Sequence, residues 1–228
     1  MAFGVAQDYW ALGDTIWEPQ SSTLTPQASL ANAQDSEGDN ACEQQYNAYD
    51  QWSVVYKLVG LAADTVTVSS KTKCGTIIAI DTATKGVVTS IEVATANTDF
   101  PTITVAGEEW YGDTEARTYT DPFPDISPLK YGQAIGFVAD TYSRVTSSTG
   151  SMTVQVARVA DSVGVFVRTA VYQGRAEASG ELVHCTTTAG AVADTAHGWA
   201  LTKNNDVNSD NASFGTSTVN AYQNVSAD

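Results

Sequence analysis

Basic residues are scarce in this chain: 11 Lys and Arg residues stand against 26 Asp and Glu residues, which gives a formal net charge of −15. They are mostly scattered singly, as at Lys57, Lys85, Arg117, Arg158 and Arg175. Nucleic-acid binding normally needs a basic patch that neutralises phosphates and releases counterions. The composition therefore argues against specific DNA or RNA recognition. An acidic surface favours solubility. It would also suit the wall of a channel through which DNA slides without binding.

Cysteines and long apolar runs are also few. Cys42, Cys74 and Cys185 lie far apart and form no C-x-x-C pair, so neither a zinc knuckle nor a disulfide framework is indicated, and we expect buried free thiols. No stretch approaches the ~20 apolar residues that a membrane helix requires. Residues 1–10 lack the basic residue and the apolar run of a secretory signal. We expect a protein that is soluble as given and binds no membrane.

Catalytic motifs are absent from the sequence, which contains no G-x-S-x-G, H-E-x-x-H or P-loop. The two histidines, His184 and His197, are the only candidates for a neutral base beside a nucleophile. His184 precedes Cys185, but neighbouring residues on a strand point to opposite faces. We therefore predict structural roles for both histidines.

Three carboxylates, Glu108, Glu109 and Asp113, lie close to Trp110 and Tyr111 and raise the idea of a glycosidase. Glycoside hydrolysis needs two carboxylates about 5–9.5 Å apart that face one cleft. On an extended chain the two glutamates diverge, and the glycines on either side favour an exposed loop. We predict that the protein is not an enzyme and has no catalytic, cofactor-binding or metal-binding residues.

Two acidic segments could hold calcium, at residues 35–39 and 206–210. In the first, acidic residues alternate around Gly38, and the second matches the first three ligand positions of an EF-hand loop. The second has Asn211 where that loop needs Gly and Ser217 where it needs Glu. Solvated turns are the favoured interpretation, and a structural ion in either loop is the alternative. The residues concerned are Asp35, Glu37, Asp39, Asp206, Asn208 and Asp210.

Strand signals dominate the chain after residue 50. Turn residues separate the runs: Asp81 and Gly86 can open and close a hairpin, and residues 160–162 can join two long strands. We predict an all-β fold, an antiparallel sandwich or barrel with an extended N-terminal arm and little helix. The expected strands are Trp52–Leu58, Thr65–Ser69, Thr76–Ile80, Val87–Val93, Thr102–Val105, Ala134–Val138, Met152–Val159, Val163–Val171, Gly180–Cys185 and Ser213–Ala221.

The predicted organisation has two parts, residues 1–50 and residues 51–228. The first reads as an arm anchored by large side chains such as Trp10 and Trp17. The one helix candidate is Asp39–Gln51, where Cys42, Tyr46 and Tyr49 recur at i, i+4 and i+7, and a polar loop is the alternative. Residues 51–228 form the β core. Residues 120–130 hold three of the six prolines and mark the boundary if the core has two units.

The five tryptophans could stack on sugars, which makes a carbohydrate-binding module a rival function. They are dispersed in sequence, so packing in a core or an interface is the expected role. They are Trp10, Trp17, Trp52, Trp110 and Trp199.

Two stretches, S-I-E-V-A-T-A-N-T-D-F-P-T-I-T-V-A-G-E (90–108) and T-P-Q-A-S-L-A-N-A-Q-D-S-E-G-D (25–39), resemble structural proteins of tailed bacteriophage virions. The resemblance implies a non-enzymatic subunit located in the virion. A self-assembling tail-tube protein, with a β sandwich, extended arms and an acidic lumen, is favoured. A head-decoration or capsid-associated protein is the second role, and a secreted surface-layer or carbohydrate-binding module is the rival class.

The partners expected for such a subunit are copies of itself and other virion proteins. Unpaired edge strands are a liability in a soluble monomer, so we expect them to be covered on assembly. The arm hypothesis is that Trp10 and Trp17 bury themselves on neighbouring copies.

Overall fold

A computed structural model describes residues 16–34, 36–59, 68, 72–80, 84–112, 117–127, 132–139, 143–184, 198–202, 206–208 and 215–227. Within them the strands form one antiparallel sheet in the order β1-β2-β5-β4-β6-β7-β10-β8, with β3 beside β4 and β9 beside β10. The prediction of an antiparallel all-β fold is confirmed. The strands are β1 (Trp17–Gln34), β2 (Asn40–Leu58), β3 (Ile77–Ala79), β4 (Lys85–Ala96), β5 (Thr102–Trp110), β6 (Ser143–Ala160), β7 (Phe166–His184), β8 (Ala200–Leu201), β9 (Asp206–Asn208) and β10 (Thr216–Val225).

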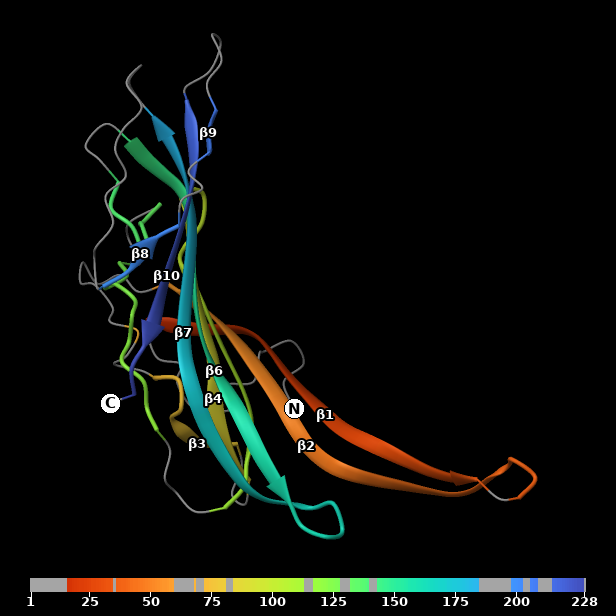
Figure 1. The fold of residues 1–228 in the computed structure, drawn as a ribbon. Helices are drawn as coiled ribbons and strands as arrows, with labels where there is room; N and C mark the ends of the chain where they lie inside the picture. The colour runs from red at the N-terminus through yellow and green to blue at the C-terminus, as the bar shows by residue number, and fades with distance from the viewer. Residues whose placement is uncertain are drawn as a thin grey trace.

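One face of the twisted sheet is covered by segments without regular structure, the described parts of residues 117–139, drawn in green in Figure 1. Phe123 and Ile135 lie over Gly150 of β6, where an added Cβ would come within 3.0 and 2.4 Å of them. Phe137 lies over Gly180 of β7 in the same way. Because glycine leaves room at these two positions, aromatic rings fill the space beside the sheet and close the core.

The inward side chains of the long strands alternate with outward ones, as the period of a half-buried strand requires. On β7 the residues from Gly174 to His184 alternate between buried and partly or fully exposed positions. Four of the five tryptophans, Trp17, Trp52, Trp110 and Trp199, are buried in the core, and Trp10 lies outside the described residues. The expected packing role is confirmed for these four. No helix in the described part of the chain is long and apolar enough to cross a membrane.

Both predicted hairpins are present. β3 pairs with β4, and at the start of the turn between them the Ile80 N–H donates to Thr84 O at 2.9 Å. β6 pairs with β7 across a turn in which Asp161 Oδ1 accepts the N–H groups of Val163 and Val165, both at 2.9 Å. The strands on the two sides of residues 120–130 belong to one sheet, because β4 pairs with β6.

The interpretation of Asp39–Gln51 as a helix or polar loop is wrong, since Asn40 to Gln51 belong to β2, which pairs with β1, and only Asp39 lies in the turn. A β-bulge explains the helical spacing. Tyr49 lies opposite Gln27 and Tyr46 opposite Ser29, so β2 carries one extra residue here, and Asn47 has a φ of 53°. The extra residue returns Tyr46 and Tyr49 to the same face of the strand, at the spacing of a helix.

The arm hypothesis for Trp17 is also wrong. This side chain is 0% exposed and packs against Tyr56 of its own chain, with ring centroids 5.8 Å apart. It anchors the start of β1 to the core and cannot reach a neighbouring copy. Residues 1–15, including Trp10, lie outside the described residues.

The two edges of the sheet differ. Along β10, the outer side is met in turn by β9, by β8 and by the bridge between Tyr119 and Ala227. At the opposite edge, β1 pairs with β2 alone among the described strands. Pro19 and Pro26 lie on β1, and proline is typical of edge strands because it removes a backbone donor.

Candidate functional site

The outer part of the β1–β2 hairpin projects away from the other described strands (Figure 1). β2 pairs with β5 only from Gln51 to Lys57, whereas it stays paired with β1 as far as the pair of Gln34 and Asn40. Residues 26–50 therefore form a two-stranded ribbon that no third strand of the described chain joins, and we call these residues the ribbon. At ~3.3 Å per residue its length is about 30 Å, and Figure 1 shows that it points away from the rest of the sheet.

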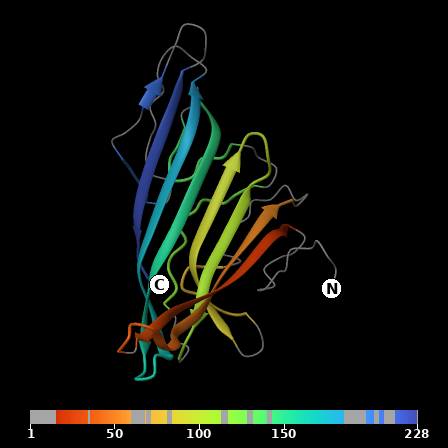
Figure 2. The same ribbon diagram turned by 90° about the vertical axis from the view of Figure 1, so that its right-hand side faces the viewer.

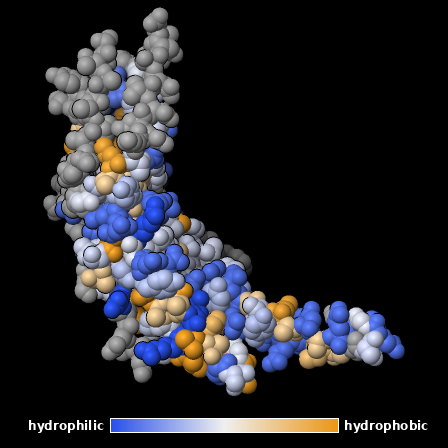
Figure 3. Space-filling view, viewed as in Figure 1, coloured by the Kyte–Doolittle hydropathy of each residue, from blue (hydrophilic) through white to orange (hydrophobic). Residues whose placement is uncertain are grey.

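The ribbon has little core of its own. Most of its described side chains are exposed, and they include Leu30 at 59% and part of Tyr46. Figure 3 shows apolar patches scattered along its otherwise hydrophilic length. An isolated two-stranded hairpin is marginally stable in water. The ribbon therefore depends on what holds its base and on what covers its surface.

The charge of the ribbon has one sign. Its acidic residues number five, and it contains no Lys or Arg. The same holds for the whole N-terminal quarter: residues 1–56 contain eight acidic and no basic residues, so they contribute −8 of the net −15. This segment of the chain therefore carries charge of a single sign.

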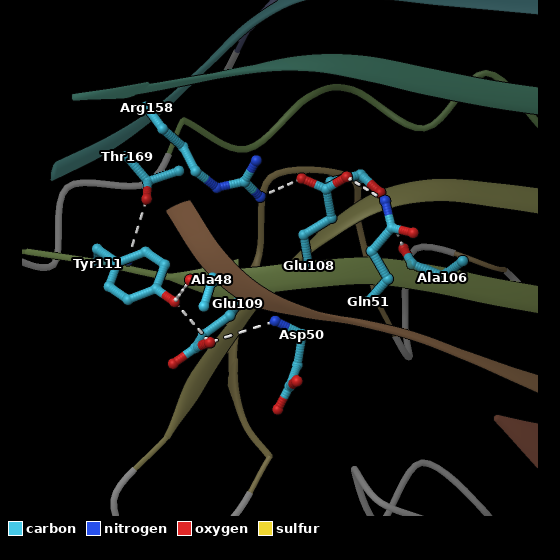
Figure 4. Close-up of polar contacts among 10 residues, drawn as sticks. Ala48, Asp50, Gln51, Ala106, Glu108, Glu109, Tyr111, Arg158 and Thr169 are labelled. Carbon is cyan, nitrogen blue, oxygen red and sulfur yellow. Dashed lines mark hydrogen bonds and ion pairs between the residues drawn. The ribbon is translucent and has the colours of Figure 1, made fainter. Parts of the chain in front are cut away.

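Arg158 of β6 holds the base of the ribbon. Its guanidinium lies over the ring of Tyr49, 4.1 Å from the centroid, and 5.5 Å from that of Phe166. It also forms an ion pair with Glu108 of β5, and the two side chains are only 12% and 19% exposed. Gln51 Nε2 donates to the other oxygen of Glu108 at 3.0 Å. Figure 4 shows Glu108 between Arg158 and Gln51. With its ring contacts, this cation thus joins β2, β5 and β6.

A second set of contacts lies beside the first. Tyr111 Oη is 2.6 Å from Glu109 Oε2 and 3.0 Å from Ala48 O, and either oxygen can accept its proton. Asp50 N–H donates to the same Glu109 oxygen at 3.3 Å, and Tyr111 N–H donates to Thr169 Oγ1 at 3.0 Å (Figure 4). Burial, and then the bond to the Glu109 carboxylate, raise the pKa of Tyr111 well above its usual range.

The turn of the β6–β7 hairpin completes the support. Asn47 N–H, at the bulge of β2, donates to Gly164 O at 2.9 Å. Tyr49 meets Phe166 edge-on, with centroids 6.1 Å apart. The two hairpins thus cross, as Figure 2 shows, and these contacts join them where they cross. We call these contacts the crossing.

Beyond the crossing, the β6–β7 hairpin ends in an apolar surface. Four valines at this end are between 49% and 64% exposed, and we call them the valine tip. Exposed apolar residues that gather at the end of a hairpin are typical of a contact surface. The residues are Val159, Val163, Val165 and Val167.

The structure separates the glycosidase candidates. Glu108 and Glu109 are consecutive on β5 and diverge, as predicted, toward Arg158 and Tyr111 respectively. The expectation of an exposed loop is wrong, because the segment is a strand as far as the buried Trp110. Asp113 lies outside the described residues. Both glutamates are occupied in holding the crossing.

His184 is buried between two serines. Its Nδ1 is 2.8 Å from Ser143 Oγ of β6, and its Nε2 is 2.5 Å from Ser217 Oγ of β10. All three side chains are buried, and no carboxylate completes a catalytic triad among these contacts. The imidazole ties three strands together, in agreement with a structural role. His197 and Cys185 lie outside the described residues.

The calcium candidates are only partly described. Glu37 and Asp39 lie in the turn of the ribbon, while Asp35 and the side chains of 206–210 lie outside the described residues. No group of three or more His, Cys, Asp or Glu side chains is placed to hold a metal ion in the part of the chain that the structure describes.

The sequence matches no protein-family model and no curated protein. What the chain does is therefore to be inferred from its surfaces. Sequence reasoning missed two of them, the ribbon and the crossing. The lack of basic residues before Lys57 is a sequence signal that marks the ribbon. No local pattern marks the crossing, because its charged pair joins residues 50 positions apart.

Proposed function

We propose that the protein is a non-enzymatic, self-assembling structural subunit of a virus particle, of the tail-tube kind found in tailed bacteriophages. The observation that carries this proposal is the ribbon: about 30 Å of two-stranded sheet that pairs with no third strand among the described residues. An element of this kind gains its stability by burial on another molecule.

The crossing supports the same function. A flexible loop would lose conformational entropy when it docked, whereas a ribbon held at its base loses less. Arg158, Asn47 and Tyr49 fix the direction in which the ribbon leaves the sheet. The protein therefore presents a preorganised arm, as a subunit that must fit a repeating array requires.

The tail-tube assignment rests on charge and on the resemblance of residues 25–39 and 90–108 to virion proteins. A net charge of −15 suits a subunit that surrounds DNA without binding it. The four buried tryptophans favour this function over a sugar-binding module, because none of them offers a stacking surface.

Light scattering coupled to size exclusion, with negative-stain microscopy of the same fractions, tests the proposal. The full chain is expected to form rings, tubes or other large oligomers. The matched variant lacks residues 30–45 and joins Ser29 to Tyr46 through Asn-Gly, a two-residue turn that suits paired strand positions. This variant is expected to remain folded by circular dichroism and to stay monomeric.

Two results would contradict the proposal. A full chain that stays monomeric at high concentration would exclude self-assembly and point to a decoration protein or a glycan-binding module, which capsid and sugar-array binding would then separate. A shortened variant that assembles like the full chain would exclude the ribbon as the assembling element.

A further inference from the structure

A groove on the sheet is lined by basic and amide side chains and lies where β10 ends beside β7. It has a volume of about 620 Å³. Arg117 and Arg175 line it together with Gln155, Gln173 and Asn224, and none of the described residues in its lining is acidic. In a chain with 26 acidic and 11 basic residues, a groove with two arginines and no carboxylate stands out.

The groove offers donors suited to carboxylates. Guanidinium groups bind carboxylates through two parallel N–H donors, and side-chain amides add further donors. Arg175 pairs with Glu177 at 2.7 Å, but both side chains are about 60% exposed. An exposed pair of this kind is weak and can be exchanged for another partner.

The backbone beside the groove is irregular. Pairing of β10 with β7 ends at Val225 and Gly174, and β7 continues past this point without a strand on that side in the described part of the chain. Gln173 has a φ of 50°, at the point where the register between β6 and β7 shifts. Strained non-glycine residues and bulges of this kind concentrate at functional sites.

We propose that the groove receives the ribbon of a second copy of this chain. The inference rests on the proposed function and names the surface to which the ribbon binds. The ribbon carries five acidic residues and no basic one, so its charge is complementary to that of the groove.

The ribbon cannot occupy the groove of its own chain. It leaves the sheet in the direction set by the crossing, whereas the groove lies at the C-terminal end of β10, on the opposite side in Figure 1. Binding between different surfaces of two copies is head-to-tail. Such contacts close into rings or continue as helical filaments, depending on the rotation between copies.

Charge reversal tests the pairing. The groove variant is Arg117→Glu with Arg175→Glu, the ribbon variant is Glu37→Lys with Glu43→Lys, and the third chain carries all four changes. Sedimentation velocity is expected to show self-association at least about tenfold weaker in each two-residue variant, because attractive pairs become repulsive. The four-residue chain is expected to regain most of the affinity.

The control carries Arg144→Glu and Arg168→Glu, which change the net charge as the groove variant does but lie outside the groove. It is expected to associate like the unmodified chain. If the unmodified chain assembles and the groove and ribbon variants match it, the ribbon binds elsewhere and this inference is wrong while the proposed function stands. If the unmodified chain does not assemble at all, the proposed function fails as well.

A disulfide measurement keeps the inference testable if a charge variant does not fold. Cys42 is an exposed thiol on the ribbon, and Gln155→Cys places a second thiol in the groove. The control is Thr218→Cys, an exposed position on β10 outside the groove. Under mild oxidation the Gln155→Cys chain is expected to form disulfide-linked oligomers at least about tenfold faster than this control, because docking raises the effective thiol concentration. Equal rates at the two positions would overturn the inference.

Discussion

Replacing Arg158 with alanine is expected to destabilise the sheet by about 2 kcal/mol. The ion pair with Glu108 contributes about 2 kcal/mol, toward the lower end for charged hydrogen bonds since both side chains are partly exposed. The stack on Tyr49 adds about 1 kcal/mol. Against these, Arg158 Nε is buried without a hydrogen-bond partner in the described structure, so removing it relieves about 1 kcal/mol.

Urea unfolding followed by tryptophan fluorescence measures this loss. The shortened-ribbon background keeps unfolding separate from association. Arg175→Ala is the matched control, because its pair with Glu177 is exposed and should contribute at most about 0.5 kcal/mol. Combining Arg158→Ala with Glu108→Gln should give a coupling energy of about 1 kcal/mol.

Hydrogen exchange at Asn47 reports on the ribbon itself. Its amide bonds to Gly164 O across the crossing, so loss of Arg158 should increase its exchange rate more than that of amides in β7. The reasoning would be refuted if Arg158→Ala and Arg175→Ala were equally stable. It would also be refuted if the Asn47 amide kept its full protection.

Three further predictions concern single side chains. The pKa of Tyr111 is raised in the folded chain, so its phenol stabilises the fold below the unfolded pKa of about 10, and this stability is lost as the pH rises above that value. In a plot of unfolding free energy against pH, Tyr111→Phe should therefore flatten the alkaline limb. Burial raises the pKa of Cys74 to about 12, whereas Cys42 is exposed. In a chain whose third cysteine is replaced by serine, a maleimide should label Cys42 rapidly and Cys74 only on unfolding. Equal labelling rates would contradict this. Gly107→Ala places a Cβ 2.0 Å from a backbone oxygen and should lower the unfolding free energy by about 3 kcal/mol. Gly38→Ala meets no neighbouring atom and should lower it by about 1 kcal/mol for its positive φ alone. Similar losses of the two variants in thermal melts would contradict the packing argument.

The parts of the fold that sequence predicted best are strands with one wet and one dry face. The run Met152–Val159 alternates in the sequence and lies in β6, and residues 166–171 of the run Val163–Val171 lie in β7, whereas Val163 to Val165 belong to the turn between the two strands. Both strands extend well beyond these runs, into segments rich in Ser, Thr, Gly and Ala. Along much of these segments every second residue is buried, as at Ser148, Gly150 and Ala178, but most of the buried residues are too small or polar for an apolar periodicity to mark a strand.

The ribbon escaped prediction for a different reason. Both of its faces are exposed, so no alternation between apolar and polar residues is needed. The spacing of Cys42, Tyr46 and Tyr49 predicts a helix, because the sequence does not reveal the extra residue of the bulge. Trp17 was misjudged because an early tryptophan in a polar segment carries no mark of what it packs against. The Arg158–Glu108 pair joins β6 to β5, which are distant in sequence and are not neighbours in the sheet, so no local pattern predicts it.

The unequal edges of the sheet bear on aggregation. Long uncovered edges on both sides would let copies add to one another without limit, as in a cross-β fibril. Here β9, β8 and the Tyr119–Ala227 bridge occupy the outer side of β10, and β1 is interrupted by two prolines. Edge-to-edge growth would therefore stop after one addition, so the chain can accumulate at high concentration before assembly without being drawn into amyloid.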